Sequence, residues 1–457
     1  MKPKSELHHG DCLDVMRAMP ANSVTAIVTD PPYALTAASR NGIPRTNDTA
    51  TPYGRTRLGE KGFMGQTWDG ALPSTEIWQE ALRVAKPGAM LLAFGGTRTY
   101  HRLACAIEDA GWEIRDCLSW CYGVGFPKSL DVSKAIDKAA GEERAPRGAA
   151  YRVPDAQRTR PHFVQFGEEP DATCSYQPTA PATDAAKLWD GYGTALKPSH
   201  EPIVLAMKPL DGTFAANAQQ HGVAGINVDG GRIGSDARHN PSAATNGQAA
   251  PVLTAGRETT GRWPANLILD EEAAAMLDEM SGEQRDGVAI RHGGVSGGRT
   301  SIVRAKPPGT PDLGYGGSGG ASRFFYTAKV SAHERTSGGR VVNGHPTLKP
   351  IALMRWLIRL VTMPTGTVIL DPFMGSGSTG VACAQEKVDF IGIEREAEYI
   401  EIARQRLDIQ SKVGMPKPEK LNGKSVEEVQ RATAERIAAA KARVQSQSRV
   451  GMPKEQA

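Results

Sequence analysis

The sequence predicts an α/β fold with a Rossmann-like, mostly parallel sheet, because short apolar runs alternate with segments of helical periodicity. The apolar run from Val24 to Thr29 is followed by a helical pattern from Ser74 to Lys86 and by a second apolar run from Ala89 to Phe94. The same alternation returns after His345. Strands joined by helices in this order form βαβ units, so we expect a parallel sheet covered on both faces.

The first half of the chain continues this pattern. Pro87 and Gly88 stop the first helix, Thr97 can cap a helix that runs to Ile107, and Trp112 to Trp120 alternates as a strand. The apolar segment from Pro202 to Met207 is expected to pair with that strand as an antiparallel hairpin at the sheet edge. The sheet is therefore predicted to be parallel except at one edge.

The second half predicts three further helices and two strands. The helices are expected at Pro350 to Thr362, Thr379 to Glu386 and Ala397 to Ile409, and the strands at Val368 to Leu370 and Phe390 to Ile393.

Two insertions interrupt the predicted core. The predicted units are residues 1–122 (first part of the core), 123–199 (insertion), 200–209 (core strand), 210–340 (second insertion), 341–410 (second part of the core) and 411–457 (polar tail with helical spacing). A disordered linker is the alternative for the insertions. Trp189, Trp263 and the cluster Phe324-Phe325-Tyr326 argue against it, because such side chains need burial or a partner.

Composition excludes several classes of protein. The chain has 457 residues, six cysteines and a formal net charge of +4. The cysteines form no paired CxxC set, which argues against both a disulfide scaffold and a zinc site, so we expect no metal. The first residues lack the apolar stretch of a signal peptide, and no segment is apolar enough to span a membrane. We therefore expect a cytoplasmic protein, and the mild charge does not decide whether it binds nucleic acid.

A glycine-rich loop follows the strand that ends near residue 370. The segment from Asp371 to Gly380 reads DPFMGSGSTG, and Glu394 comes nineteen residues after Gly375, at the end of the next predicted strand. Glycines allow a ligand close to the backbone, and a carboxylate at this distance can accept both hydroxyls of a ribose. Asp371 suits the ammonium group of a methionine moiety better than a pyrophosphate, which argues against a nicotinamide cofactor. A simple glycine turn is the remaining alternative.

A second motif, Asp30-Pro31-Pro32-Tyr33, follows the first strand. The two prolines remove two amide donors, so local carbonyls are free to accept from another group. Asp30 and the Pro31 carbonyl can accept the two hydrogens of an exocyclic amine while Tyr33 stacks on the base. An ordinary turn explains two prolines, but it does not explain this set together with the glycine-rich loop.

With these motifs in this order, the chain resembles the β class of amino-directed DNA methyltransferases that use S-adenosylmethionine. The resemblance rests on the two motifs and on His8 to Leu13, Lys86-Pro87-Gly88, Pro202 to Pro209 with His200-Glu201 ahead of it, and His345 to Pro350. It implies a target-recognition region at 210–340. It implies catalytic roles for Asp30, Pro31, Pro32 and Tyr33. It also implies cofactor binding by Asp11, Cys12, His345, Pro346, Thr347, Lys349, Asp371, Phe373, Gly375, Ser376, Gly377, Ser378, Thr379 and Glu394.

The resemblance implies methylation of adenine N6 after base flipping, because Asp in the first position of the motif is more frequent among adenine enzymes. Cytosine N4 methylation is the alternative within the class. A dehydrogenase using NAD and a DNA-binding protein without catalysis are alternatives from other classes. The expected partner is double-stranded DNA, and no association with a membrane is expected. The sequence leaves open whether the protein forms a homodimer and whether it is paired with a restriction enzyme.

Basic segments indicate where DNA binds. The loop after Tyr33 carries Arg40, Arg45, Arg55 and Arg57, and residues 286–340 hold eight Lys or Arg against three Asp or Glu, a net charge of +5. Arg299, Arg304 and Arg323 of this segment are expected to contact phosphates. A solvated surface loop is the alternative.

Overall fold

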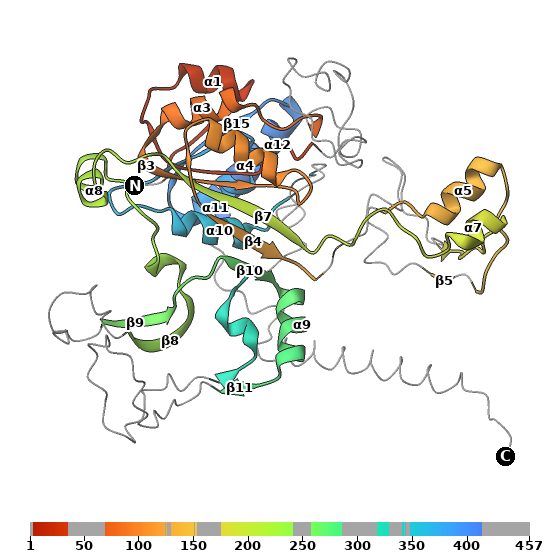
Figure 1. The fold of residues 1–457 in the computed structure, drawn as a ribbon. Helices are drawn as coiled ribbons and strands as arrows, with labels where there is room; N and C mark the ends of the chain where they lie inside the picture. The colour runs from red at the N-terminus through yellow and green to blue at the C-terminus, as the bar shows by residue number, and fades with distance from the viewer. Residues whose placement is uncertain are drawn as a thin grey trace, which may run out of the picture.

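The computed structural model of the full chain describes residues 3–34, 69–123, 125, 129–149, 151–152, 175–240, 257–285, 318–328, 341, 343 and 348–413. Within these residues one mixed sheet forms the centre of the molecule (Figure 1). Its strands lie in the order β1 (Ser5–His9), β15 (Asp389–Glu394), β14 (Val368–Asp371), β2 (Val24–Thr29), β3 (Ala85–Phe94), β7 (His200–Met207), β4 (Glu113–Cys121), β10 (Leu267–Asp270) and β13 (Tyr326–Ala328).

Neighbouring strands of this sheet are parallel except where β7 pairs with β3 and β4. The predicted α/β class and the antiparallel pairing of residues 202–207 with the strand at Trp112 to Trp120 are therefore confirmed. The predicted edge position of that pair is wrong, because β10 and β13 extend the sheet beyond β4. Both come from the segment predicted to lie outside the core, and they are too short to show a periodicity in the sequence.

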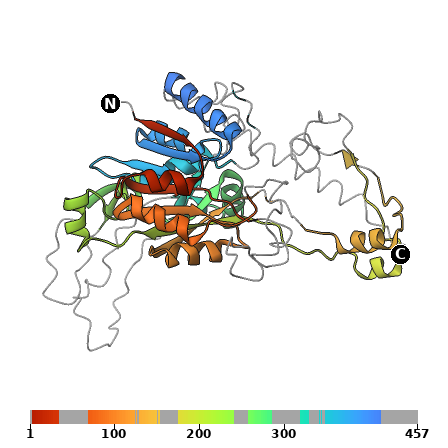
Figure 2. The same cartoon turned by 90° about the horizontal axis from the view of Figure 1, so that it is seen from above.

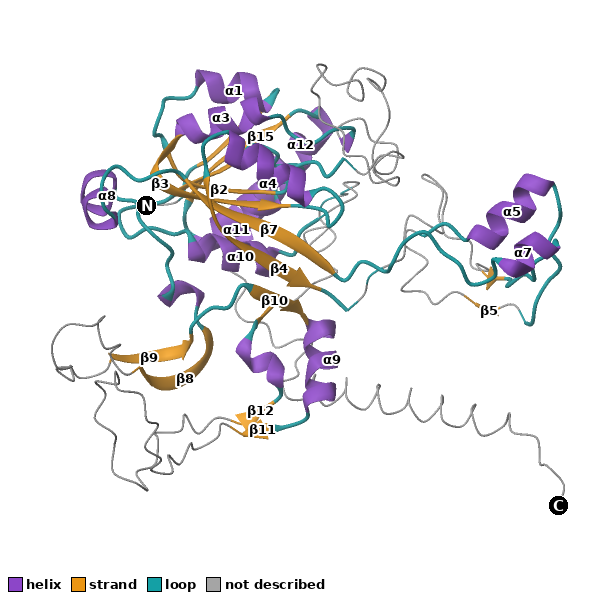
Figure 3. Ribbon diagram, in the orientation of Figure 1, coloured by secondary structure: helices purple, strands orange, loops and turns teal. Residues whose placement is uncertain are grey.

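Side chains of the central strands alternate between two buried clusters. In β3, Met90, Leu92 and Phe94 pack on one face of the sheet, while Leu91 and Ala93 pack on the other. The first face is covered by α10 (Ile351–Leu360), α11 (Ser378–Glu386) and α12 (Ala397–Val413). The second is covered by α1 (Cys12–Ala18), α3 (Thr75–Val84) and α4 (Tyr100–Asp109) (Figure 3). Apolar residues on both faces explain why these strands are continuous apolar runs rather than alternating ones.

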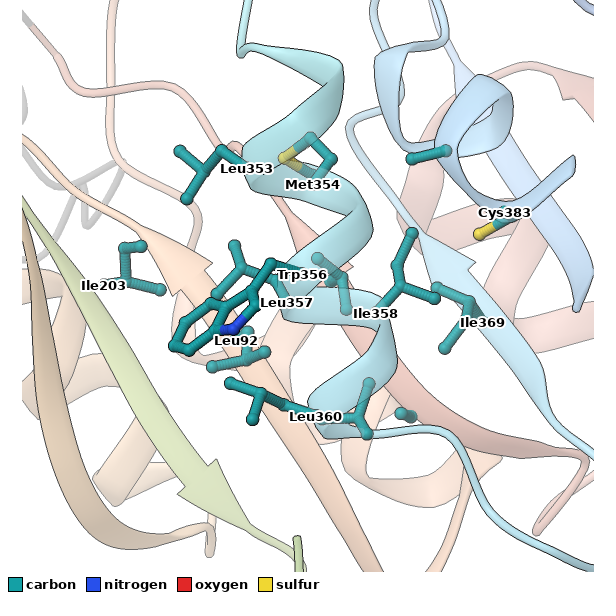
Figure 4. Close-up of a cluster of buried hydrophobic side chains, with 14 of the residues drawn as sticks. Leu92, Ile203, Leu353, Met354, Trp356, Leu357, Ile358, Leu360, Ile369 and Cys383 are labelled. Atoms are coloured by element: carbon teal, nitrogen blue, oxygen red, sulfur yellow. The ribbon is translucent and has the colours of Figure 1, made fainter. Parts of the chain in front are cut away.

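Helix α10 lies at the centre of the first cluster (Figure 4). Leu353, Trp356, Leu357 and Leu360 are buried at helical spacing, and Pro350 stands at the N-cap. Proline is favourable near a helix start, where its missing N–H has no intrahelical partner. The indole of Trp356 stacks on Tyr326 of β13, with ring centroids 4.9 Å apart. The helix thus connects the core to a strand of the 210–340 segment.

The remaining elements belong to the two insertions. Helices α5 (Val132–Ala140) and α7 (Asp184–Leu188) pack together, and with β5 (Tyr151–Arg152) and β6 (Ser175–Tyr176) they stand to one side of the sheet (Figure 2). The second insertion holds α8 (Phe214–His221), η4 (Asp229–Gly231), β8 (Ile233–Asn240), β9 (Arg257–Arg262), α9 (Glu271–Ser281), β11 (Gln284–Arg285), β12 (Ser318–Gly319) and η5 (Ala321–Phe324). Among the described helices, none is long and apolar enough to cross a membrane.

Candidate functional site

Three carboxylates lie at the carboxyl edge of adjacent parallel strands. Asp30 follows β2, Asp371 is the last residue of β14, and Glu394 is the last residue of β15. Because these strands are neighbours in the order β15, β14, β2, their ends meet at one edge of the sheet. Ligands of open α/β sheets bind at this edge. The two motifs, separated by 341 residues in the sequence, therefore form one site.

Asp371 connects the two motifs. Its side chain is 1% exposed. Its Oδ1 accepts a hydrogen bond from the Thr29 hydroxyl at 2.6 Å, and its Oδ2 accepts one from the Thr379 hydroxyl at 2.5 Å. The backbone N–H of Phe373 also donates to Oδ1, at 3.1 Å. The carboxylate is thus held by donors of the protein itself, and its predicted contact with an ammonium group stays a prediction.

Burial raises the pKa of Asp371 to about 6, although the hydrogen bonds oppose the shift. The folded protein therefore holds this proton more tightly than the unfolded chain, where the pKa is near 3.8. Stability should fall as the pH rises from about 4 to about 6, by up to about 3 kcal/mol. In the Asp371→Asn variant this titration is absent, so the parent should lose stability relative to the variant over that window. Urea unfolding at several pH values measures the difference, and parallel curves would contradict the assignment.

Backbone geometry and a buried cation shape the glycine-rich loop. Gly375 and Gly377 have φ of 54° and 83°, in the left-handed region that favours glycine. A Cβ on Gly377 would lie 2.9 Å from the Cβ of Ala403 in α12. From the same helix, the buried Arg406 donates to the carbonyl oxygen of Ser376 at 2.6 Å. Sequence analysis missed Arg406, because an arginine in an amphipathic helix is usually on its solvated face.

Glu394 ties the loop to the next helix. Its Oε2 accepts from the N–H of Gly375 at 2.8 Å, and its Oε1 accepts from the N–H of Glu396 at 2.7 Å. Burial raises the pKa of this carboxyl group. Each oxygen of a carboxylate has two acceptor positions, so both oxygens can still accept from a ligand hydroxyl.

Residues Asp11 and Cys12 lie beside Glu394, because the N–H of Gly10 donates to the Glu394 carbonyl at 3.0 Å. Asp11 is exposed and caps α1 by accepting from the N–H of Leu13 at 2.9 Å. The Cys12 side chain is buried in the core, and burial raises its thiol pKa to about 12. Its thiol therefore packs in the core, and cofactor binding by Asp11 and Cys12 stays a prediction.

Tyr33 and its neighbours form the second half of the site. The Tyr33 hydroxyl lies 2.8 Å from Asp30 Oδ1 and 3.1 Å from Glu201 Oε2. Burial and the two carboxylates raise the pKa of this phenol well above its ordinary value. The turn is fixed by Asp69, which accepts from the N–H groups of Tyr33 and Ala34 at 2.8 and 3.0 Å. The tyrosine, expected only to stack on a base, thus also orients Asp30.

The side chain of Lys349 contacts residues of this cluster. Its ammonium donates to Asp30 Oδ2 at 2.6 Å and lies 3.3 Å from Glu201 Oε2. Its side chain is 7% exposed, and its Nζ lies 5.2 Å from the centre of the Tyr33 ring. The structure places Lys349 in contact with Asp30, and cofactor binding by Lys349 stays a prediction. Sequence analysis noted Glu201 only as part of a motif, because its partners lie 168 and 148 residues away in the sequence.

The other predicted residues have mixed outcomes. Phe373 is partly buried, with its ring 6.2 Å from that of Trp78. Arg323 donates to the carbonyl oxygens of Gly319 and Gly320 and lies over the Phe324 ring, so its guanidinium is partly used within the protein. The predicted residues Arg40, Arg45, Arg55, Arg57, Arg299, Arg304, His345, Pro346 and Thr347 lie outside the described residues. In the described part of the chain, no group of three or more His, Cys, Asp or Glu side chains is arranged to hold a metal ion.

A family model for N6/N4 methyltransferases, described as DNA methylase, matches residues 24–405. The chain belongs to this family. The match includes Asp30 to Tyr33, the glycine-rich loop and Glu394, which the structure brings to one edge of the sheet. S-adenosylmethionine is the cofactor that the family uses.

Individual relatives are similar over shorter stretches. The type II methyltransferase M2.DpnII of Streptococcus pneumoniae is 48% identical over 67 residues, which are 15% of this chain and 25% of the relative. The type II methyltransferase M.Cfr9I of Citrobacter freundii is 36% identical over 100 residues, 19% of this chain and 33% of that relative. The chain thus spans a quarter to a third of the length of these relatives.

Two solved structures align over most of the chain at low identity. The PvuII DNA methyltransferase, named as cytosine-N4-specific, is 13% identical with a TM-score of 0.39, covering 90% of this chain and 95% of the other. The M1.HpyAVI–SAM complex is 16% identical with a TM-score of 0.35, covering 88% and 99%.

Proposed function

We propose that this protein is a site-specific DNA methyltransferase that transfers a methyl group from S-adenosylmethionine to N6 of adenine after base flipping. The observation that carries the proposal is the hydrogen bond from Thr29 to Asp371. It joins the residue before Asp30 to the first residue of the glycine-rich loop. An amine held by Asp30 would therefore lie next to a cofactor held by the loop.

The chemistry of the loop and its neighbours fits the cofactor. Glu394 offers two carboxylate oxygens to the two hydroxyls of a ribose, and the exposed Asp11 lies beside it to accept from an adenine amino group. Gly375 and Gly377 allow the left-handed turns of the loop, and the missing side chain of Gly377 lets the loop pack against Ala403 of α12. The bound cofactor supplies an electrophilic methyl group on a sulfonium. Asp371 and Arg406 hold the loop in place from behind.

Asp30 and the turn around it act on the base. An exocyclic amine is a poor nucleophile because its lone pair is delocalised into the ring. Hydrogen bonds from the amine to Asp30 and to the Pro31 carbonyl favour a more tetrahedral nitrogen with its lone pair directed at the methyl group. Tyr33 and Lys349 fix the Asp30 carboxylate for this role. No covalent bond between enzyme and DNA is required.

The target sequence would be recognised elsewhere in the chain. We assign recognition to residues 210–340 and phosphate contacts to the basic residues of 286–340, whose net charge is +5. Phosphate contacts release counterions, so DNA binding should weaken as salt concentration rises.

The experiment that tests the function is methylation of plasmid DNA with labelled S-adenosylmethionine, followed by hydrolysis to nucleosides and mass spectrometry. We expect N6-methyladenine. Recovery of N4-methylcytosine would show that the base is cytosine and would contradict the adenine part of the proposal. Absence of label from DNA would contradict the proposal as a whole.

Glu394→Ala should weaken cofactor binding without unfolding the protein. The variant removes the two oxygens proposed to accept from the ribose, and hydrogen bonds to a charged group contribute about 1.5 to 3 kcal/mol. Isothermal titration with S-adenosylmethionine measures the loss. Glu398→Ala, an exposed position in α12, is the control and should bind like the parent. Unchanged affinity in folded Glu394→Ala would remove this residue from the cofactor site.

A further inference from the structure

Glu201, on β7, lies in the cluster around Asp30 although neither motif contains it. Its Oε2 is 3.3 Å from the Lys349 ammonium and 3.1 Å from the Tyr33 hydroxyl. These two groups are the ones that bind Asp30, at 2.6 and 2.8 Å. Each group that orients Asp30 therefore also contacts Glu201.

The side chain of Glu201 has no evident role in building the strand. Backbone pairing holds β7 on both sides, against β3 and against β4, and Glu201 itself pairs with Trp120. Its carboxylate is partly buried, with 23% of the side chain exposed. A partly buried carboxylate that is not needed to form the strand indicates a role in the reaction at the neighbouring Asp30.

The charges of the cluster leave one net negative charge. Burial alone lowers the pKa of Lys349, but Asp30 and Glu201 outweigh it and the pKa is raised, so the lysine stays protonated. With two carboxylates and one ammonium, the cluster carries one net negative charge. Without Glu201, the positive charge of Lys349 would balance the negative charge of Asp30, and the cluster would be neutral.

The proposed reaction places a positive charge beside this cluster. The amine lone pair forms the new N–C bond while the C–S bond breaks and its electron pair stays on sulfur. The positive charge thus moves from the sulfonium to the nitrogen, which then loses one proton to water. A site with a net negative charge next to the nitrogen stabilises that charge as it develops, and such preorganised electrostatics is a large contribution to catalysis.

We propose that Glu201 is a positioning residue for methyl transfer, an inference that rests on the proposed function. It holds Lys349 and Tyr33 against Asp30, and it leaves the cluster one net negative charge where the amine becomes positive.

Glu201→Gln tests this role, because glutamine keeps the shape of the side chain and removes its charge. We expect the single-turnover rate of methyl transfer to fall about tenfold or more. Affinities for S-adenosylmethionine and DNA, and the thermal midpoint, should match the parent. Glu108→Gln, an exposed position in α4, is the control and should transfer at the parent rate. A parent-like rate in Glu201→Gln overturns the inference, whereas an inactive parent would contradict the proposed function instead.

The pH dependence separates a charge effect from a packing effect. In Glu201→Gln one of the two carboxylates that raise the Lys349 pKa is gone, so the lysine should lose its proton at a lower pH than in the parent. Loss of that proton restores the net charge of −1, and the rate deficit should shrink as the pH rises toward the ordinary pKa of a lysine. The neighbouring phenols do not titrate in this window: the pKa of Tyr33 is raised well above its ordinary value and that of Tyr122 to about 12, chiefly by burial. Asp371, with a pKa of about 6, is already ionised.

Two further variants complete the test. Adding Lys349→Arg to Glu201→Gln should abolish the recovery at high pH, because a guanidinium keeps its proton. Glu201→Asp keeps the charge but shortens the side chain, so it should transfer faster than Glu201→Gln. A rate deficit of Glu201→Gln that stays constant with pH would overturn the proposed role of the charge. A faster rate in Glu201→Gln than in Glu201→Asp would overturn it as well, and the packing of the side chain would then explain the effect.

Discussion

Asp30→Ala should abolish detectable methyl transfer to DNA while the protein still binds S-adenosylmethionine within a few-fold of the parent. The variant removes the acceptor of one amine hydrogen, so the nitrogen lone pair is no longer directed at the methyl group. It also leaves the buried Lys349 ammonium with Glu201 as its remaining carboxylate partner in the cluster. Removal of one preorganised hydrogen-bonding group from a catalytic site typically lowers a rate by about 10² to 10³.

Transfer is measured with labelled cofactor, alongside separate binding constants for cofactor and DNA. Asp109→Ala, an exposed aspartate at the end of α4, serves as the matched control and should transfer at the parent rate. The role assigned to Asp30 fails if the folded variant transfers near the parent rate. It fails equally if weaker cofactor binding accounts for all of the lost activity.

The strands that carry the site could be predicted from the sequence because they are buried on both faces. Residues 24–29 form a strand with the predicted bounds, and the strand predicted at 368–370 differs by one residue. A continuous apolar run that ends in a polar motif gives both the strand and the position of the site at its end. The carboxyl edge of the sheet then follows from the parallel arrangement alone.

The contacts within the site could not be predicted in the same way, because they join residues that are far apart in the sequence. Lys349 is separated from Asp30 by 319 residues. The packing on the sheet of α10, which begins two residues after Lys349, brings the two side chains to 2.6 Å. Arg406 is likewise one of several charged residues in α12, an amphipathic helix in which a solvated position is the usual expectation for a charged side chain. Burial against the glycine-rich loop gives this arginine its role.

Two short strands explain why the domain boundaries could not be predicted accurately from the sequence. β10 has four residues and β13 three, yet both extend the sheet beyond β4. Segments of this length carry too few residues for an alternating or continuous apolar pattern to stand out. Part of the insertion predicted at 210–340 therefore belongs to the central sheet.

Trp356→Ala should destabilise the protein by about 3 to 5 kcal/mol, the range for a buried tryptophan truncated to alanine. Trp356 is 1% exposed, stacks on Tyr326 of β13 with an interplanar angle of 9°, and donates from its indole N–H to the Gly231 carbonyl at 3.0 Å. The variant leaves a cavity between α10 and the sheet and removes both contacts to the 210–340 segment. Equilibrium unfolding in urea measures the loss.

The matched control is Trp263→Ala. The side chain of Trp263 is 67% exposed and lies beside Arg232, so its removal should cost about 1 kcal/mol or less. Equal losses in the two variants would show that Trp356 does not anchor the insertion to the core.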